Sequence, residues 1–65
     1  MPKKYVGELV EIIYLSKSGA FTQRKVTISS IKDGIIRAID KGTGEWRTFR
    51  EDSIMAWQPV INSAV

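Results

Sequence analysis

The sequence contains neither cysteine nor histidine. Without cysteine the chain cannot form a disulfide or a thiolate metal site, and without either residue it lacks the usual zinc ligands. The absence of histidine also removes the side chain that most often carries protons near neutral pH, so the serines have no such partner. The adjacent acids Glu51 and Asp52 are typical of a helical-turn cap rather than a metal site. We therefore predict that the protein is not an enzyme and has no catalytic residue, metal site or cofactor.

Long apolar runs are also missing. Two lysines near the N-terminus precede an apolar stretch, but Glu8 and Glu11 interrupt that stretch between residues 6 and 15. This pattern argues against the apolar segment of a signal peptide and against a membrane-spanning helix. We expect a cytoplasmic protein without a membrane partner.

The length of 65 residues predicts one domain. A chain of this size buries only about 60% of the surface that its unfolded form exposes, so its core must be small. We expect an N-terminal tail at residues 1–6, a single domain at residues 7–58 and a C-terminal tail at residues 59–65.

Segments rich in β-branched and aromatic residues alternate with glycine-containing turn sequences along the chain. Helical spacing of apolar residues also exists over residues 6–15, but its isoleucines and valines favour a strand. Residues 51–53 are expected to form one helical turn. The strands are expected at residues 7–15, 21–28 or 21–30, 35–40, 46–50, and 54–57 or 54–58.

Five short strands spaced about ten residues apart are typical of a small barrel. No helical pattern is longer than one turn. The predicted fold class is therefore mainly β, a small five-stranded Sm-like or Src-homology-like barrel with one short helical turn before the last strand.

The basic residues suggest a binding site. Ten lysines and arginines against seven acids give a net charge of +3, and the arginines fall on three different predicted strands. Neighbouring strands of a small barrel can bring such guanidinium groups to one anion, and their planar fork suits phosphate. The alternative is that these side chains are solvated and paired with Glu8, Glu11, Asp40 or Glu45. The candidate anion-binding residues are Arg24, Lys25, Arg37, Arg47 and Arg50.

Strand alternation separates the aromatic residues of the fourth strand. Phe49 shares a face with Arg47, whereas Trp46 lies on the opposite face with Arg50. If Phe49 is in the core, Trp46 is exposed, where it could stack on a nucleobase or contact another protein chain. We expect Tyr14 and Trp57 to lie in the core or at an end of the barrel.

Four elements follow one another along the chain: Tyr14 at a strand end, Arg24-Lys25-Val26, Ala38-Ile39-Asp40, and the pair Arg47 and Phe49. In this order they resemble the WYL domain, an Sm-like small barrel found mostly in bacterial transcription regulators. The resemblance spans about residues 8–57. Where the name-giving Trp-Tyr-Leu would fall, this chain has Gly34-Ile35-Ile36. Ser53 stands in place of an arginine, and Ile28 in place of a proline.

The resemblance implies a basic pocket for nucleic acid or a nucleotide-like effector, with Arg24 and Arg47 at the matching basic positions. It also implies a regulatory role in a bacterium or phage. We therefore expect a binding module for single-stranded nucleic acid or a nucleotide-like anion, with Trp46 and Arg50 as secondary contacts. The alternative is a protein-interaction or self-association module that uses an exposed sheet edge or the surface around Trp46.

Overall fold

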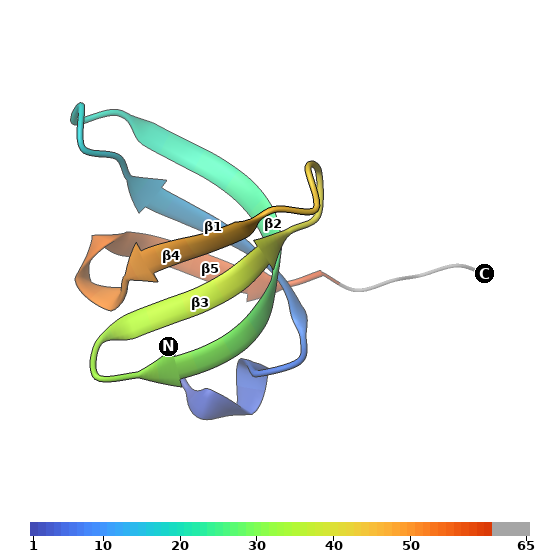
Figure 1. Cartoon of the computed structure of the whole chain (residues 1–65). Coiled ribbons are helices and arrows are strands. Elements are labelled where there is room, and N and C mark those ends of the chain that lie inside the picture. The colour runs from blue at the N-terminus through green and yellow to red at the C-terminus, as the bar shows by residue number, and fades with distance from the viewer. Residues whose placement is uncertain (61–65) are drawn as a thin grey trace.

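Five antiparallel strands form one strongly curved sheet in the computed structural model, which describes residues 1–60 (Figure 1). The spatial order of the strands is β4-β3-β2-β1-β5. Short 3-10 helical turns precede the first strand and join the last two. The elements in chain order are η1 (Lys3–Tyr5), β1 (Leu9–Leu15), β2 (Phe21–Lys32), β3 (Ile35–Asp40), β4 (Trp46–Arg50), η2 (Glu51–Ser53) and β5 (Ile54–Pro59).

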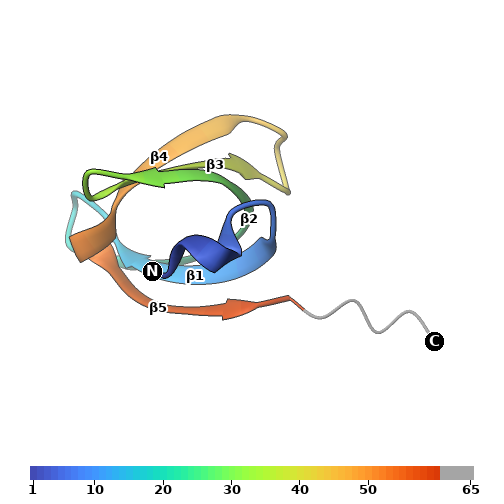
Figure 2. The ribbon, with the colours of Figure 1, turned by 90° about the horizontal axis from the view of Figure 1, so that it is seen from below.

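The predicted mainly β class with five strands is confirmed, and so is the helical turn before the last strand. The alternative helix over residues 6–15 does not form, because β1 occupies most of that range. Within residues 1–60, β4 and β5 each pair with a single neighbouring strand, so the sheet is not closed. Figure 2 shows the sheet curling so that β4 and β5 lie on opposite sides of the fold, joined by η2. The barrel itself is therefore not established.

Strand β2 is the longest element and produces the curvature. Its first half pairs with β1, from Phe21 to Thr27, and its second half pairs with β3, from Val26 to Lys32. The register with β3 shifts between Ile28 and Ser30, and a bulge of this kind bends a strand and increases its twist. One strand thus takes part in both halves of the curved sheet.

Several element bounds differ from the prediction. The first strand begins at Leu9 rather than residue 7, because Gly7 has a φ of 89°. Pairing across the bulge carries β2 to Lys32, and β5 continues to Pro59. The predicted N-terminal tail contains η1, while residues 61–65 of the predicted C-terminal tail lie outside the described residues.

The predicted turn before the third strand is present. Asp33 and Gly34 have φ values of 52° and 75°, and Lys32 pairs directly with Ile35 on either side of them. Two successive residues at positive φ match the right-handed twist of the flanking strands, which is why Asp-Gly is favoured in two-residue hairpins.

The core lies on the concave face of the sheet. Side chains alternate along each strand, so that Val10 and Ile12 of β1 are fully buried while Ile13 is 37% exposed on the convex face. Met1 and Tyr5, which precede the first strand, also pack against this core. The buried apolar residues are Val10, Ile12, Val26, Ile28, Ile36, Ala38, Phe49 and Ile54.

Candidate functional site

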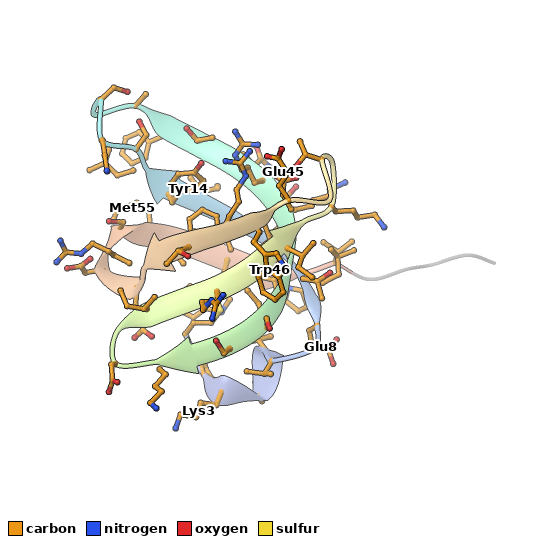
Figure 3. All side chains as sticks on the ribbon, viewed as in Figure 1. Lys3, Glu8, Tyr14, Glu45, Trp46 and Met55 are labelled. Atoms are coloured by element: carbon orange, nitrogen blue, oxygen red, sulfur yellow. The ribbon has the colours of Figure 1, made fainter. Side chains whose placement is uncertain are left out.

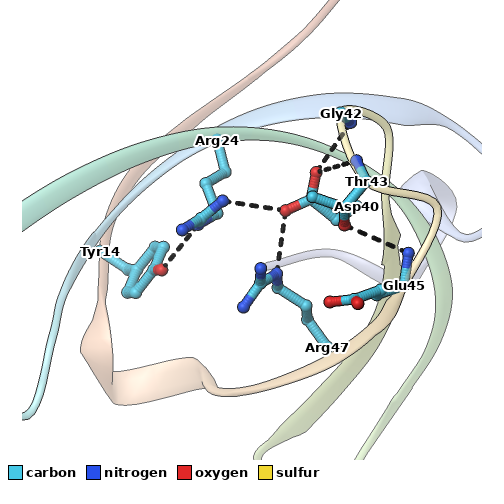
Figure 4. A network of polar contacts seen from close by, with 7 residues as sticks. All are labelled: Tyr14, Arg24, Asp40, Gly42, Thr43, Glu45 and Arg47. Carbon is cyan, nitrogen blue, oxygen red and sulfur yellow. Dashed lines mark hydrogen bonds and ion pairs between the residues drawn. The ribbon is translucent and has the colours of Figure 1, made fainter.

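Polar side chains continue the concave face beyond the apolar core. In the strand register, Arg24 is paired with Ile12, Asp40 with Val26, and Arg47 with Ala38. Residues paired directly across neighbouring strands lie on the same face of the sheet. These three polar residues therefore lie on the concave face, beside buried apolar residues. Tyr14 follows Ile12 by two residues on the same face. We call Tyr14, Arg24, Asp40 and Arg47 the Asp40 cluster (Figure 4).

Asp40 is the centre of the cluster. It is 3% exposed, and its Oδ2 accepts a hydrogen bond of 3.0 Å from Arg24 Nη1 and one of 2.9 Å from Arg47 Nε. Its Oδ1 accepts backbone hydrogen bonds from Gly42, at 2.8 Å, and Thr43, at 3.3 Å. The carboxylate thus joins β2, β3, β4 and the hairpin that follows β3, and its charge is compensated by two guanidinium groups.

The two arginines keep hydrogen-bond donors available. Arg24 also donates from Nε to the hydroxyl of Tyr14 at 3.0 Å, which raises the pKa of Arg24. Within residues 1–60, Arg24 Nη2 and both terminal nitrogens of Arg47 have no hydrogen-bond partner. About a third of each side chain is exposed, 33% for Arg24 and 32% for Arg47. Each guanidinium is therefore anchored on one side and can donate to a ligand on the other.

The surroundings of Asp40 favour its charged form. Burial alone would raise the pKa of Asp40, but hydrogen bonds from the backbone of Gly42, from Arg47 and from the backbone of Thr43 lower it, as does the charge of Arg24. The net effect is a pKa below the usual value for aspartate. The carboxylate stays ionised wherever the protein is folded at ordinary pH.

Acid is therefore expected to destabilise the protein partly through Asp40. Because the folded state lowers the pKa of Asp40, the ionised carboxylate contributes stability above about pH 4, the unfolded pKa. That contribution is lost as pH falls through the lower folded pKa. Urea denaturation between pH 7 and pH 2 measures the loss. The Asp40→Asn variant should unfold at lower urea concentration at pH 7 and lose less stability in acid than the wild type. An equally steep acid loss in both proteins would contradict the assignment.

The remaining predicted basic residues do not join the cluster. Arg37 lies on the convex face, with its guanidinium 5.3 Å from the centre of the Trp46 ring. Arg50 is 74% exposed at its side chain and pairs with Asp52 at 3.3 Å. Lys25 is exposed on the convex face of β2. The expected convergence of arginines from three strands therefore holds for Arg24 and Arg47 alone.

The aromatic residues fall on the predicted faces, with one exception. Trp46 is 58% exposed on the convex side of β4, whereas Phe49 is 7% exposed (Figure 3). Tyr14 packs against the core and against Phe49, with ring centres 4.8 Å apart. Trp57 was expected in the core or at a barrel end, but it is 39% exposed because it lies on the edge strand β5.

A groove beside the cluster connects the arginines with aromatic surface. It has a volume of about 560 Å³ and lies between the end of β1 and strand β4. Arg47 lines it together with Tyr14, Trp46 and Phe49, and two further cations, Lys17 of the β1–β2 turn and Arg50, also line it. A smaller hollow of about 440 Å³ lies on the other side of Arg24, next to Lys41. The arginine pair therefore stands between two depressions of the surface.

The central role of Asp40 was not predicted, although the sequence carries a signal for it. Asp40 follows Ile36 and Ala38 at intervals of two residues, so alternation places it on the buried face at the end of the strand. A carboxylate in such a position needs hydrogen-bonded or charged partners. Arg24 and Arg47 supply them, so the alternative that these two arginines pair with Asp40 is confirmed.

Comparison with protein-family models, curated proteins and solved structures finds no match to this chain. Within residues 1–60, no helix is long and apolar enough to cross a membrane. The same part of the chain has no group of three or more acidic side chains that could hold a metal ion. The resemblance to the WYL domain stays a prediction.

Proposed function

We propose that the protein is a WYL-like small-barrel module with a regulatory role that binds single-stranded nucleic acid or a nucleotide-like anion at Arg24 and Arg47. The observation that carries this proposal is the position of the two guanidinium groups. They come from β2 and β4, meet at one Asp40 oxygen, and keep terminal nitrogens without partners within residues 1–60. A phosphate oxygen beside them would receive charge-assisted hydrogen bonds, which are shorter and stronger than neutral ones.

The fixed positions of the two arginine side chains support the same function. Long flexible side chains lose rotamer freedom when a ligand immobilises them, and this loss opposes binding. Here the hydrogen bonds to Asp40 and Tyr14 already hold the two guanidiniums in the free protein. Binding an anion would therefore immobilise little additional structure.

The groove offers a place for a base. Its lining combines Arg47 and Lys17 with the rings of Tyr14, Trp46 and Phe49. In proteins that bind single strands, aromatic side chains stack on bases while cations contact the backbone. Trp46, which is 58% exposed, is the most accessible ring of this set, since Phe49 is buried.

Fluorescence anisotropy with a labelled oligothymidylate tests the proposal. Each phosphate contact to a single strand contributes about −0.7 to the slope of log affinity against log salt. If Arg24 and Arg47 neutralise about two phosphates, the affinity should fall about sevenfold between 50 mM and 200 mM salt. Affinity that does not change with salt would exclude phosphate contacts. No binding at 50 mM salt would contradict the proposed function and leave self-association as the standing prediction.

A further inference from the structure

The groove beside Arg47 runs along the free edge of β4. Every residue of that strand lines the groove, and the opposite wall is formed by the end of β1 and the turn that follows it. Within residues 1–60, β4 pairs with β3 alone. The edge of a sheet presents a row of unpaired backbone N–H and C=O groups to any chain that approaches it. The groove therefore lies where a further strand would pair.

The hydrogen bonds at the two ends of the β3–β4 ladder show which backbone groups of β4 are free. The backbone N–H of Asp40 donates to the carbonyl of Glu45, and that of Glu51 donates to the carbonyl of Gly34, both at 2.8 Å. Both pairs continue the register of the two strands. In an antiparallel ladder, residues that exchange backbone hydrogen bonds recur at every second position. The odd-numbered residues of β4 therefore bond to β3, and the backbone groups of its even-numbered residues point away from β3.

The free backbone groups of Trp46 and Thr48 match a peptide better than other occupants. They alternate donors with acceptors, and an extended peptide offers both at the same spacing. The phosphates of a nucleic acid would accept from the N–H groups, but they donate nothing to the carbonyls. A second copy of the chain that paired through its own β4 would bring like charges together, and its β5 contains no acidic residue.

Three cations and no acid line the groove. They are Lys17 of the β1–β2 turn, Arg47 on the concave face of β4 and Arg50 on its convex face. The ion pair between Arg50 and Asp52 is exposed, at 74% and 71% of the two side chains, and pairs of this kind contribute little. An incoming strand with acidic side chains would therefore meet complementary charge on both faces of β4.

We propose that the free edge of β4 binds an extended acidic peptide of a partner protein by β-strand addition. In the antiparallel orientation, one acidic side chain of the peptide lies beside Arg50 on the convex face, and another lies beside Arg47 on the concave face. A β-branched residue of the peptide packs beside Trp46, a favourable cross-strand pair. This interaction goes beyond nucleic acid binding, and the two ligands compete because both reach Arg47.

A pentapeptide with capped ends and the sequence Glu-Val-Thr-Glu-Val tests strand addition. Its residues lie opposite β4 in order, the first beside Arg50 and the last beside Trp46. Binding to the wild-type protein is followed by NMR chemical-shift titration to about 10 mM peptide, which detects millimolar affinity. Shifts are expected at the backbone amides of Trp46 and Thr48. A peptide with lysine in place of both glutamates should cause no shifts there, because its charges repel those of the groove.

Two N-methylated peptides give a matched comparison on the same wild-type protein. In the proposed pairing, the N–H of the peptide threonine points to Thr48 of β4, whereas the N–H of the second glutamate points away from β4. A methyl group on the threonine nitrogen should weaken binding at least about threefold, because a hydrogen bond is lost. A methyl group on the glutamate nitrogen removes no such bond and should leave the affinity within about twofold. Equal affinities of the two methylated peptides would overturn the proposal.

The Thr48→Pro variant removes the same contact from the protein side. The N–H of Thr48 points away from β3, and proline is tolerated in an edge strand at such a position. Circular dichroism establishes whether the variant is folded. The folded variant should bind the pentapeptide at least about threefold more weakly. Its affinity for oligothymidylate should stay within about twofold, because Arg24 and Arg47 are unchanged.

The two ligands separate this proposal from the proposed function. Absence of shifts at β4 with the pentapeptide would overturn strand addition, while the oligothymidylate titration tests nucleic acid binding independently. If Thr48→Pro weakened oligothymidylate binding and the pentapeptide caused no shifts, the edge of β4 would be assigned to nucleic acid instead. Where both ligands bind, excess oligothymidylate should displace the pentapeptide. Simultaneous binding of the two would place the peptide outside the groove and contradict the proposal.

Discussion

Replacing Arg47 with alanine is expected to lower the affinity for oligothymidylate by about 10- to 100-fold. Hydrogen bonds that involve a charged group contribute about 1.5–3 kcal/mol, and each 1.4 kcal/mol is a tenfold change in affinity. Arg47 combines the terminal nitrogens that have no partner within residues 1–60 with a position on the groove wall. Fluorescence anisotropy at low salt measures the change, and circular dichroism at the same temperature establishes that the variant is folded.

Lys32→Ala is the charge control for Arg47→Ala. It also removes one positive charge, but Lys32 is exposed at the end of β2 and lines neither depression beside the Asp40 cluster. Its affinity should stay within about twofold of the wild type, because a distant exposed charge acts through screened electrostatics alone. Equal losses in the two variants would show that binding depends on overall charge rather than on the cluster. An unfolded Arg47→Ala protein would assign Arg47 a structural role.

Replacing Ile36 with alanine is expected to unfold a large fraction of the protein. Ile36 is fully buried, and substitutions of buried isoleucine by alanine typically cost about 2–5 kcal/mol. A domain of 65 residues has a total stability of about 3–10 kcal/mol at the usual value per residue. The loss is therefore comparable with the whole free energy of unfolding. Urea denaturation followed by circular dichroism measures it.

Ile35→Ala is the control for this substitution. Ile35 is the adjacent residue in β3 and is 37% exposed on the opposite face, so the same change in chemistry should cost well under half as much. If the two variants lost equal stability, the assignment of faces along β3 would be incorrect. The Asp40 cluster would then lose its place on the concave side, because Asp40 shares the face of Ile36.

Local signals in the sequence were sufficient to predict most of the strands. Turn residues such as Asp33-Gly34 separate segments rich in β-branched residues, and each segment is long enough for one strand. The end of β2 was predicted at residue 28 or residue 30, short of Lys32, because Ser29 and Ser30 are weak strand formers. They remain in the strand because the bulge after Ile28 lets pairing with β3 continue. That interaction is tertiary and has no local sequence signal.

For the site residues, the sequence predicts only the face of the sheet on which each lies, because side chains alternate between the two faces along a strand. Arg24 shares a face with Val26, and Arg47 shares a face with Phe49, so both belong on the concave side. The same alternation places Arg37 on the convex face, so it would have excluded Arg37 from the predicted anion-binding site. Which carboxylate meets the two arginines depends on the strand register. The register was not predictable, because the position of the bulge in β2 sets it.

NMR of the arginine Nε–Hε groups tests the convergence of Arg24 and Arg47 most directly. In the structure these two Nε–H groups donate to Tyr14 and Asp40. Their signals should be protected from exchange with water in the free protein and should shift when oligothymidylate is added. The Nε–H groups of Arg37 and Arg50 have no hydrogen-bond partner within residues 1–60, so their signals should exchange rapidly. Shifts confined to Arg37 and Arg50, or rapid exchange at all four arginines, would contradict an anion site built on Asp40.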